Sequence, residues 1–394
     1  MADKNVQKIN EILTRGVEEI FVRGDLEKAL LSGKKLTIKL GIDPTSPNIH
    51  IGRAVVLWKL RSFQELGHKI VFIVGDFTGL IGDTSDKESE RPMLGEREVK
   101  KNLKTYFAQA FKILDKNKTK TYYNSSWLKK LGFKEIGEMA DLFGLHEFEA
   151  RENISKRLKA GKRVSLRELL YPLMQGYDSV YIKADVELGG TDQKFNLLAG
   201  RTIQKHYKQI PQNIVITSLI EGTDGRKMSS SWGNVINIID EPNDMFGKVM
   251  SLPDSLIEKY FIFTTRIPTE EIKKLNQENT NPRDLKMILA KEIVKLYHGE
   301  KMAISASDSF IKQFQKKEVP EDMGGVVIYN KNTPLVDILL QNKLVASKSE
   351  FQRLFDGGAI EIIGKGKISS SKIIITEGAI IKVGKRRFLK IILK

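Results

Sequence analysis

The stretch 36-LTIKLGIDPTSPNIHIGR-53 carries the strongest local signal for the fold. Its first seven residues, Leu36–Ile42, form a mostly apolar run of the kind found in buried strands. The turn-forming segment DPTSPN follows, and a helical pattern begins near His50. The stretch therefore predicts a buried strand that passes through a tight turn into a helix.

The same succession of strand and helix recurs through the first two-thirds of the chain. Three further strands are predicted from their composition, at Lys69–Val74, Val180–Leu188 and Asn213–Leu219. Strands separated by helices indicate a parallel sheet with crossovers, so the predicted fold class is α/β, a doubly wound parallel sheet. Three of the four strands run directly into Gly- or Pro-rich turns, and ligands bind beyond the carboxyl ends of such strands.

The chain changes character twice after this part. Residues 1–239 are assigned to the α/β domain, and residues 240–320 have a charged helical pattern with few strand signals. A linker rich in Gly, Pro and acidic residues, EVPEDMGGVV, precedes the last segment, 330–394. That segment combines a short amphipathic helix, SKSEFQRLF, with the β-like runs AIEII, KIIIT, AIIKVG and RFLKIIL, which predicts a small α+β domain.

Positive charge is concentrated near the C-terminus. The 394 residues include 65 Lys or Arg and 49 Asp or Glu, which gives a formal net charge of +16. Residues 330–394 hold 13 of the basic and 5 of the acidic residues, so this last sixth carries +8. A lysine-rich composition or simple solubility is the alternative for the total charge, whereas the localisation favours a nucleic-acid-binding module at the C-terminus.

Several classes of protein are excluded or disfavoured by composition. Cysteine is absent, which excludes disulfides and thiolate metal sites. No apolar run reaches the roughly 18 residues of a transmembrane helix, and the N-terminus lacks the apolar core of a signal peptide. No cluster of His and carboxylates suggests a zinc site. We therefore expect a cytoplasmic protein with no membrane span and no metal site of its own.

Two short motifs have the composition of phosphate-binding segments. The first, His50–Arg53 (HIGR), lies at the predicted start of a helix, where backbone N–H groups attract anions. The second, Lys227–Ser231 (KMSSS), combines one lysine with hydroxyls and free N–H groups that can hold a pyrophosphate. Each alone has an ordinary alternative, because a histidine at a helix start is often a cap and the second segment could be a solvated loop.

Together and in this order, the two motifs resemble the HIGH and KMSKS signatures of class I aminoacyl-tRNA synthetases. Three more segments are similar to tyrosyl-tRNA synthetases. Tyr171–Asp178 (YPLMQGYD) resembles their tyrosine-binding helix, Gly189–Gln193 (GGTDQ) their strand-end motif at the ribose, and Gly79–Pro92 their loop after the second strand. The last segment resembles an S4 RNA-binding domain. The resemblance covers nearly the whole chain and is closest to the bacterial branch with an LGIDPT-type first loop.

This resemblance implies an enzyme that activates L-tyrosine with ATP and transfers it to the 3′ end of tRNA(Tyr). It implies a Rossmann-type catalytic domain over 1–239 with a dimerisation insertion at about 107–171, an α-helical anticodon-side domain over 240–320 and an S4-like domain over 330–394. It also implies a homodimer, and Mg²⁺ bound with ATP rather than in a protein cage. Neither step needs a protein nucleophile, so we expect catalysis by positioning and by stabilisation of developing phosphate charge.

One predicted helix face carries residues suited to tyrosine. Tyr171, Gln175 and Asp178 are spaced by four and three residues and so share a face. A carboxylate buried there needs a donor, which the phenol of tyrosine supplies, so Asp178 is expected to read the hydroxyl. An amphipathic helix with capping acids is the alternative for this segment alone. By resemblance, the tyrosine-binding residues are Lys39, Gly41, Asp83, Tyr171, Gln175, Asp178 and Gln193.

The resemblance also assigns residues to ATP and to tRNA. Asp192 is expected at the ribose, and Gln193 near the reacting carboxylate. The ATP-binding residues are Asp43, Thr45, His50, Gly52, Arg53, Gly190, Asp192, Lys227, Met228, Ser229, Ser230 and Ser231. The catalytic residues are His50 and Lys227, with Lys87 and Arg91, which would close over the pyrophosphate. The tRNA-binding residues are Lys348, Arg353, Lys385, Arg386 and Arg387.

Three positions depart from the family pattern. The last residue of the first motif is usually His and is Arg53 here; the longer, always charged side chain could reach a phosphate instead of copying an imidazole at the ribose. The usual second lysine of the other motif is Ser230. Arg226 could replace part of that charge, or Ser230 could leave room for a monovalent cation, in which case activity should differ between K⁺ and Na⁺. Lys39 occupies the place of a second tyrosine found in many relatives, which leaves more of the recognition to Asp178.

Two rival interpretations remain at this stage. A tryptophanyl-tRNA synthetase shares the fold and the signatures, although the S4-like tail and Asp178 argue against it. A non-catalytic RNA-binding paralogue, for example one that aids RNA folding or splicing, is supported only by Arg53 and Ser230, because the tyrosine and ribose motifs are intact.

Overall fold

The chain forms two compact units, Met1–Ser307 and Asp308–Lys394. The computed structural model describes residues 2–44, 46–85, 95–278, 281–312, 325–328, 333–363, 366–368, 378–384 and 387–393. The predicted helical segment from residue 240 shares the first unit with the α/β part, so three predicted segments make up two compact units.

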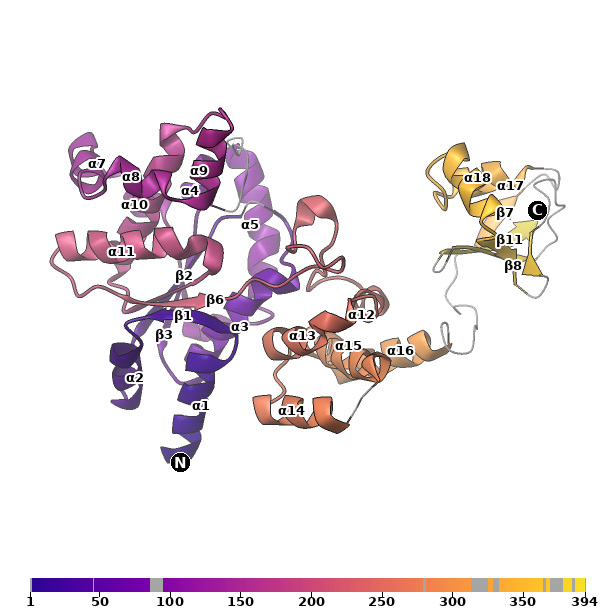
Figure 1. The fold of residues 1–394 in the computed structure, drawn as a ribbon, viewed down its shortest axis with the longest axis horizontal. Coiled ribbons are helices and arrows are strands. Elements are labelled where there is room, and N and C mark those ends of the chain that lie inside the picture. The colour runs from indigo at the N-terminus through magenta and orange to yellow at the C-terminus, as the bar shows by residue number, and fades with distance from the viewer. Residues whose placement is uncertain are drawn as a thin grey trace. The chain divides into compact units, whose positions relative to one another are not determined.

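The first unit is built on a six-stranded sheet, shown in Figure 1. Its strands are β1 (Val17–Phe21), β2 (Thr37–Ile42), β3 (Lys69–Val74), β4 (Thr119–Tyr123), β5 (Val186–Gly190) and β6 (Asn213–Thr217). The order across the sheet is β1-β6-β5-β2-β3-β4, and all neighbours are parallel except the β1–β6 pair. The chain leaves β2 toward β3 and leaves β5 toward β6, so the order reverses between β2 and β5. A ligand site is expected at this switch point.

Helices cover both faces of this sheet. Two of them carry the crossovers on either side of the switch point, α3 (Ile51–Glu65) from β2 to β3 and α11 (Lys194–His206) from β5 to β6. Because the two crossovers run in opposite directions and such crossovers are right-handed, the two helices lie on opposite faces (Figure 1). Helix α10 (Leu166–Ile182) packs against α11.

The other helices of the first unit surround this framework. They are α1 (Ala2–Thr14), α2 (Arg23–Leu31), α4 (Thr78–Ile81), α5 (Glu96–Ala110), α6 (Ser125–Leu128), α7 (Phe133–Ala140), α8 (Leu145–Glu149), α9 (Glu152–Lys159), α12 (Pro242–Met250), α13 (Ile257–Thr264), α14 (Thr269–Glu278), α15 (Pro282–His298) and α16 (Glu300–Phe310). Among the described residues, no helix is long and apolar enough to span a membrane.

Helices α12–α16 confirm the helical character predicted after residue 240. One guanidinium ties them to the N-terminal helix. Arg15 donates hydrogen bonds of 2.6–3.2 Å to the backbone carbonyls of Phe261, Ile262, Thr265 and Ile267, at the end of α13 and just beyond it. Carbonyls at a helix C-terminus lack the usual backbone donors, so the arginine caps α13 while joining it to the segment after α1.

Three strand predictions were accurate, the one for β5 began too early, and the two edge strands were missed. β2, β3 and β6 lie where the apolar runs placed them. Val180–Ile182 were predicted to begin the third strand, but they continue α10, which ends at Lys183 with a positive φ of 54°. Strands β1 and β4 were missed because they lie at the two edges, where half-buried and exposed positions alternate and no apolar run results.

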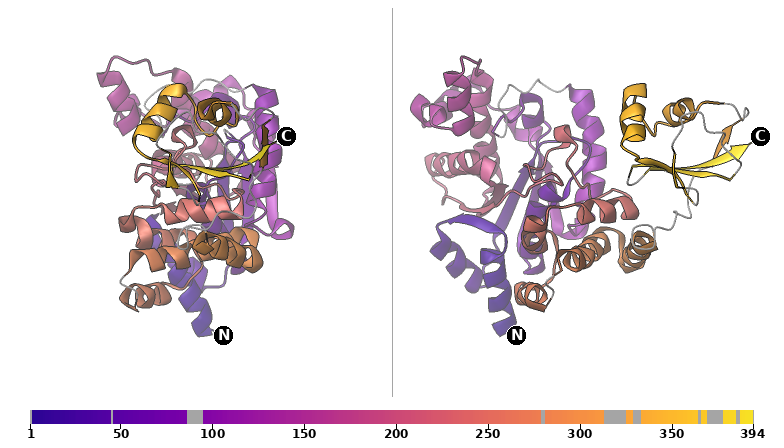
Figure 2. Two further views of the ribbon diagram at one scale, coloured as in Figure 1. Left: turned by 90° about the vertical axis from the view of Figure 1, so that its right-hand side faces the viewer. Right: turned by 45° about the vertical axis from the view of Figure 1, so that its right-hand side comes forward.

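The second unit is a small sheet with two helices on one face, which is clearest on the right of Figure 2. Its strands run in the order β7 (Gly325–Ile328), β11 (Arg387–Leu393), β10 (Ile380–Val383), β8 (Ile360–Ile362) and β9 (Gly366–Lys367). Only β7 and β11 are parallel. Helices α17 (Leu335–Gln341) and α18 (Lys348–Asp356) pack on a core that includes Leu335, Leu339, Phe351, Ile381 and Ile391. Three of the four predicted β-like runs contain β8, β10 and β11, and the fourth, KIIIT, lies outside the described residues. Strand β7 overlaps the predicted linker EVPEDMGGVV, and β9 was not predicted.

Candidate active site

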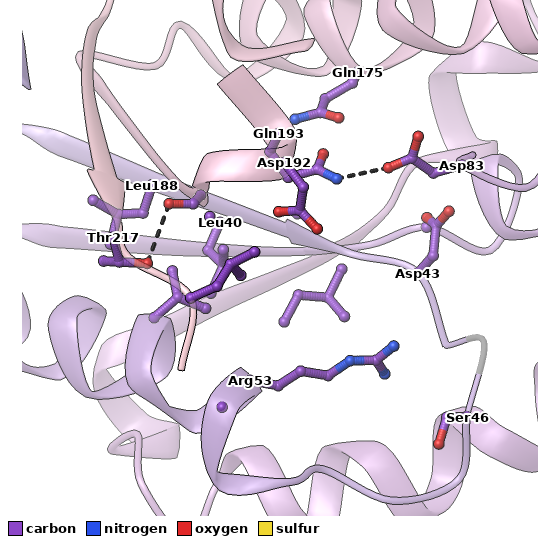
Figure 3. A pocket seen from close by; sticks show the side chains of 18 of the residues that line it. Leu40, Asp43, Ser46, Arg53, Asp83, Gln175, Leu188, Asp192, Gln193 and Thr217 are labelled. Carbon is purple, nitrogen blue, oxygen red and sulfur yellow. Dashed lines mark hydrogen bonds between the residues drawn. The ribbon is translucent and has the colours of Figure 1, made fainter. Parts of the chain in front are cut away.

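A cavity of about 390 Å³ opens at the carboxyl ends of β2 and β5, at the switch point (Figure 3). Segments far apart in the chain line it. They include most of the residues predicted from the sequence: Gly41, Asp43, His50, Gly52, Arg53, Asp83, Tyr171, Gln175, Asp178, Gly190, Asp192, Gln193, Lys227, Met228, Ser229 and Ser230. Thr45, Lys87 and Arg91 lie outside the described residues, as does the side chain of Ser231.

Asp178 is the most deeply buried carboxylate of the cavity. Its side chain accepts hydrogen bonds from the indole Nε1 of Trp127 at 2.7 Å and from the amide of Asn124 at 3.2 Å. Burial raises the pKa of this carboxyl to about 6, against the lowering effect of the nearby Lys39 charge and of these two donors. The two protein donors fix the carboxylate and leave it lone pairs for one further donor from the cavity.

Asn124 and Trp127 were not found from the sequence. Asn124 directly follows β4, so the rule that ligand-binding residues lie at strand ends would have pointed to it. That signal was lost with the edge strand itself. Trp127, in α6, had no signal in the sequence, because a tryptophan that donates to a buried carboxylate looks the same in sequence as any core tryptophan.

Asp43, just after β2, contacts α10, the helix that contains the predicted tyrosine-binding residues. The hydroxyl of Tyr171 donates to Asp43 at 2.9 Å, and that of Thr78 donates to its other oxygen at 2.7 Å. Burial and the charge of Asp43 raise the pKa of Tyr171 well above its usual value, so this hydroxyl remains a donor. The contact requires glycine at position 75, because a Cβ there would lie 1.9 Å from an Asp43 oxygen.

A second acidic group lies beside it. The Gln193 amide donates to Asp83 at 2.6 Å, drawn as a dashed line in Figure 3, and to the Ser85 hydroxyl at 2.8 Å. Ser85 in turn donates to Asp83 at 2.5 Å. These contacts join the strand-end motif at β5 to the loop after β3.

Lys39 is the one predicted tyrosine-binding residue, within the described part of the chain, that does not line the cavity. It is fully buried, and its ammonium group donates to the Gln175 carbonyl at 2.8 Å and to the Ser179 hydroxyl at 2.7 Å, and it pairs with Glu187 at 2.8 Å. These three partners use all three ammonium protons. Lys39 therefore lies beneath the cavity and supports Gln175, whose amide also donates to Glu187 at 3.1 Å.

The HIGR motif forms the start of α3. His50 is the N-cap, and its Nδ1 accepts a hydrogen bond from the backbone N–H of Arg53 at 3.3 Å. Burial, with smaller effects from the charges of Arg53 and Lys227, lowers the pKa of His50 to about 3. The imidazole is therefore neutral near pH 7, and with Nδ1 as an acceptor it carries its proton on Nε2. His50 can donate a hydrogen bond to a phosphate but contributes no charge.

The two signature motifs are packed against each other. Met228 is buried, and a Cβ on Gly52 would lie only 3.2 Å from its sulfur, so Gly52 allows this approach. Just after the second motif, the carbonyl of Ile236 accepts a hydrogen bond from Ile51 at 2.8 Å. Lys227 reaches into the cavity and lies 3.6 Å from Asp192.

Arg226 does not line the cavity. Its guanidinium binds Asp224 through two hydrogen bonds of 2.6 and 2.8 Å and lies over the Trp232 ring at 4.9 Å. The hypothesis that Arg226 replaces the charge missing at Ser230 therefore lacks the necessary geometry.

The predicted tRNA-binding residues lie in the second unit. Lys348 and Arg353 are in the first and last turns of α18. Arg387, in β11, donates to the carbonyl of Leu344 and pairs with Glu350 at 3.1 Å, so part of its function is to hold the sheet to α18. Lys385 and Arg386 lie outside the described residues.

Comparison with known proteins agrees with this arrangement. A family model described as "tRNA synthetases class I (W and Y)" matches residues 31–315. The chain is 44% identical to tyrosine–tRNA ligase 2 of Clostridium acetobutylicum, over 99% of this chain and 100% of the relative. It is 47% identical to the tyrosine–tRNA ligase of Carboxydothermus hydrogenoformans (97% of each chain) and 45% identical to that of Thermotoga maritima (97% and 96%).

Solved structures show the same fold. A truncated mitochondrial tyrosyl-tRNA synthetase from Coccidioides posadasii has a TM-score of 0.62 and 25% identity over 78% of this chain and 95% of that one. The tyrosyl-tRNA synthetase of Archaeoglobus fulgidus, solved with L-tyrosine, has a TM-score of 0.62 and 20% identity over 77% and 99%. The family match and the full-length relatives decide between the rival interpretations, and the chain belongs to the class I tyrosine–tRNA ligases, which join tyrosine to its tRNA.

Proposed function

We propose that the cavity at the ends of β2 and β5 is where tyrosine and ATP react in this ligase, with tyrosine next to Asp178 and the ATP phosphates next to His50 and Lys227. One observation carries the proposal: a single cavity is lined by both signature motifs, by the helix Tyr171–Asp178 and by the strand-end motif Gly189–Gln193. Each segment alone has an ordinary structural explanation. Their meeting in one cavity is what supports a joint role.

The reaction needs no nucleophile from the protein. A carboxylate oxygen of tyrosine bonds to the α-phosphorus of ATP, the bond from that phosphorus to the bridging oxygen breaks, and pyrophosphate leaves with the electron pair. The terminal ribose of tRNA then takes the tyrosyl group from the adenylate. Catalysis would come from positioning and from groups that stabilise phosphate charge, here His50 as a neutral donor and Lys227 as a cation.

Tyrosine would be recognised at both ends. Asp178, held by Trp127 and Asn124, would accept a hydrogen bond from the phenol hydroxyl of tyrosine. Phenylalanine would leave that buried carboxylate without its third donor. Tyr171, Gln175 and Asp83 would hold the ammonium group. Lys39 is proposed to act on tyrosine only through Gln175, because it lies outside the cavity lining.

Magnesium would arrive with ATP. The carboxylates of Asp43 and Asp83 already accept donors from neighbouring side chains, and in the described part of the chain no three His, Cys, Asp or Glu residues group closely enough to hold a metal. Mg²⁺ keeps several waters and binds substrate phosphates readily. We propose that the phosphates and water hold the ion and that it neutralises charge on the leaving pyrophosphate.

Two further parts of the proposal concern the rest of the chain. The second unit, with Lys348 and Arg353 on α18, would act as an S4-like module that binds tRNA(Tyr), and the +8 charge of residues 330–394 supports this. The segment of about 107–171 would form a homodimer contact. Its exposed apolar side chains, with Phe133 at 91% and Leu166 at 77%, support that role. We expect the enzyme to work in the cytoplasm, with the tRNA it charges.

Amino-acid-dependent ATP–pyrophosphate exchange tests the site. We expect exchange with tyrosine but neither with tryptophan nor with phenylalanine. Lys227→Met should slow it by about 10²–10³-fold, as removal of one group that stabilises a developing oxyanion does in other enzymes. Lys273→Met, which removes an exposed lysine from α14 outside the cavity, is the matched control and should have no effect. Equal rates for the two variants would place the chemistry elsewhere.

A further inference from the structure

Arg53 and Ser230, the two residues that depart from the signature motifs, line the same cavity. Arg53 adds a permanent charge where the pattern has an imidazole, and Ser230 lacks a charge where the pattern has a lysine. One departure adds a positive charge to the cavity and the other removes one. The surroundings of Arg53 therefore decide whether they are connected.

Within the described residues, the Arg53 guanidinium has no counter-ion. It forms no ion pair there, and its buried Nη1 has no hydrogen-bond partner. The hydroxyl of Tyr106 is likewise buried without a partner of ordinary geometry. Burial raises its pKa, and the charge of Arg53 and a weak contact with that side chain oppose the rise. Neither group has an acceptor of good geometry for its own proton, which is costly for buried donors, and an anion would supply one to both.

The guanidinium points into the cavity rather than along its wall. In Figure 3 the Arg53 side chain extends toward the turn that carries Asp43 and Ser46. His50 and Lys227 line the same space. After burial, the charge of Arg53 has the largest lowering effect on the pKa of His50, followed by the charge of Lys227. A phosphate between these three side chains would meet two cations and one neutral donor.

In the described part of the cavity, the other candidate groups do not supply a further cation beside Lys227. His50 is neutral, Lys227 lies 3.6 Å from Asp192, and Arg226 binds Asp224 outside the cavity. The nearby carboxylate of Asp43 accepts from Tyr171 and Thr78. Arg53 is thus the lining cation, among the described residues, whose charge no carboxylate balances.

We propose that Arg53 binds the pyrophosphate part of ATP and supplies the positive charge that Ser230 does not. The inference rests on the proposed position of ATP in this cavity. When the bond between the α-phosphorus and the bridging oxygen breaks, that oxygen keeps the electron pair and charge grows on the pyrophosphate. A guanidinium donates two parallel hydrogen bonds to such a group and stays charged at any working pH, and the Tyr106 hydroxyl adds a third donor.

Arg53→Gln tests this directly, with Arg61→Gln as the matched control. Arg61 lies on the same helix, does not line the cavity and pairs with Glu65 at 2.9 Å. Calorimetry with inorganic pyrophosphate and Mg²⁺ should show about tenfold weaker binding to Arg53→Gln, and single-turnover adenylate formation should slow by about 10²–10³-fold. The dissociation constant for tyrosine should stay within about twofold, which also checks the fold. The control should match wild type throughout.

Two results would overturn the proposal. One is unchanged pyrophosphate binding and rate in Arg53→Gln. The other is a loss of AMP binding with pyrophosphate binding intact, which would make Arg53 a ribose residue. Should Arg53→Gln lose tyrosine binding through misfolding, Arg53→Lys takes its place, because it keeps the charge but loses the two-pronged contact and should fall between Gln and wild type.

The link to Ser230 is tested by a double-mutant cycle. Ser230→Lys should raise the rate of Arg53→His at least about tenfold more than it raises the rate of wild type, because the two charges serve one phosphate group. Equal effects in both backgrounds would break the link. A monovalent cation would supply the missing charge instead if the wild-type rate requires K⁺ and the rate of Arg53→Gln is little lower than that of wild type. If Lys227→Met also leaves the rate unchanged, the proposed site itself fails; if only the Arg53 variants do, this inference alone fails.

Discussion

Asp178 is a carboxylate whose burial is costly and whose cost is offset by specific donors. Trp127 and Asn124 donate to it, yet burial still raises its pKa to about 6. A carboxyl with such a pKa is ionised at pH 7 but close enough to protonation that one more donor matters. The phenol of tyrosine would be that donor, and its binding would stabilise the ionised form.

The affinity for tyrosine should therefore depend on pH. Because the phenol donates to the carboxylate form, binding should be strongest above pH 6 and weaken as the pH falls through that value, by about tenfold at pH 5, where about one site in ten is ionised. Calorimetry between pH 5 and pH 8 measures this. Asp178→Asn should bind tyrosine more weakly at every pH and lose the dependence. A wild-type affinity that rises toward pH 5 would contradict the assignment.

Residue roles could be predicted from the sequence only where a motif fixes the neighbours. The cavity brings together nearly all the residues that the motifs suggested. Lys39 was assigned to tyrosine because it occupies the place of a second tyrosine of many relatives, but it does not line the cavity. Its partner, Glu187, is on the adjacent strand at the paired position. No local pattern connects residues 148 positions apart, so this pair could be found only from the fold.

At the scale of elements, the Lys39–Glu187 pair holds β2 to β5 at the switch point. Both side chains are at most 1% exposed, and Glu187 also accepts from Ser179 at 3.0 Å and Gln212 at 2.5 Å. Here the strands meet through a buried polar network directly under Gln175, which fixes the floor of the cavity.

Removing one member of this pair should be far worse than removing both. Lys39→Met leaves a buried carboxylate unpaired and should cost about 3–5 kcal/mol, whereas Lys39→Met with Glu187→Gln should recover most of that. Unfolding in guanidinium chloride measures this. The transition whose midpoint shifts when tyrosine is added is the unfolding of the first unit. Lys34→Met removes an exposed pair with Asp185, 3.5 Å apart, and should change stability by less than about 1 kcal/mol. Equal costs for the two lysine variants would refute the buried role.

Elements were predictable where burial is uniform and not where it is mixed. β3 is buried from Ile70 to Val74, and its apolar run predicted it to the residue. The edge strands β1 and β4 gave no such run. The end of α10 was taken for a strand because Val180-Tyr181-Ile182 has strand-like composition, while tertiary packing against α11 keeps it helical.

At the scale of the whole molecule, the division into two compact units suggests that the two steps of the reaction can be separated. The cavity lies wholly within Met1–Ser307, and the basic segment within Asp308–Lys394. Deletion of residues 330–394 should abolish tRNA charging and leave tyrosine-dependent pyrophosphate exchange within about twofold. Lys348→Glu with Arg353→Glu should weaken charging without a deletion. Loss of exchange in the truncated chain would show that the units depend on each other.

The exposed apolar side chains of the insertion lead to the last prediction. Leu166, at the start of α10, is 77% exposed, and Ile210, in the loop before β6, is 87% exposed. If the insertion forms a dimer, a charge at Leu166 would have to be buried without a partner, so Leu166→Asp should give a monomer in light scattering. Ile210→Asp, a substitution of equal chemistry outside the insertion, should leave the dimer intact. A dimer that survives Leu166→Asp, or one that both variants dissociate, would contradict an interface at this place.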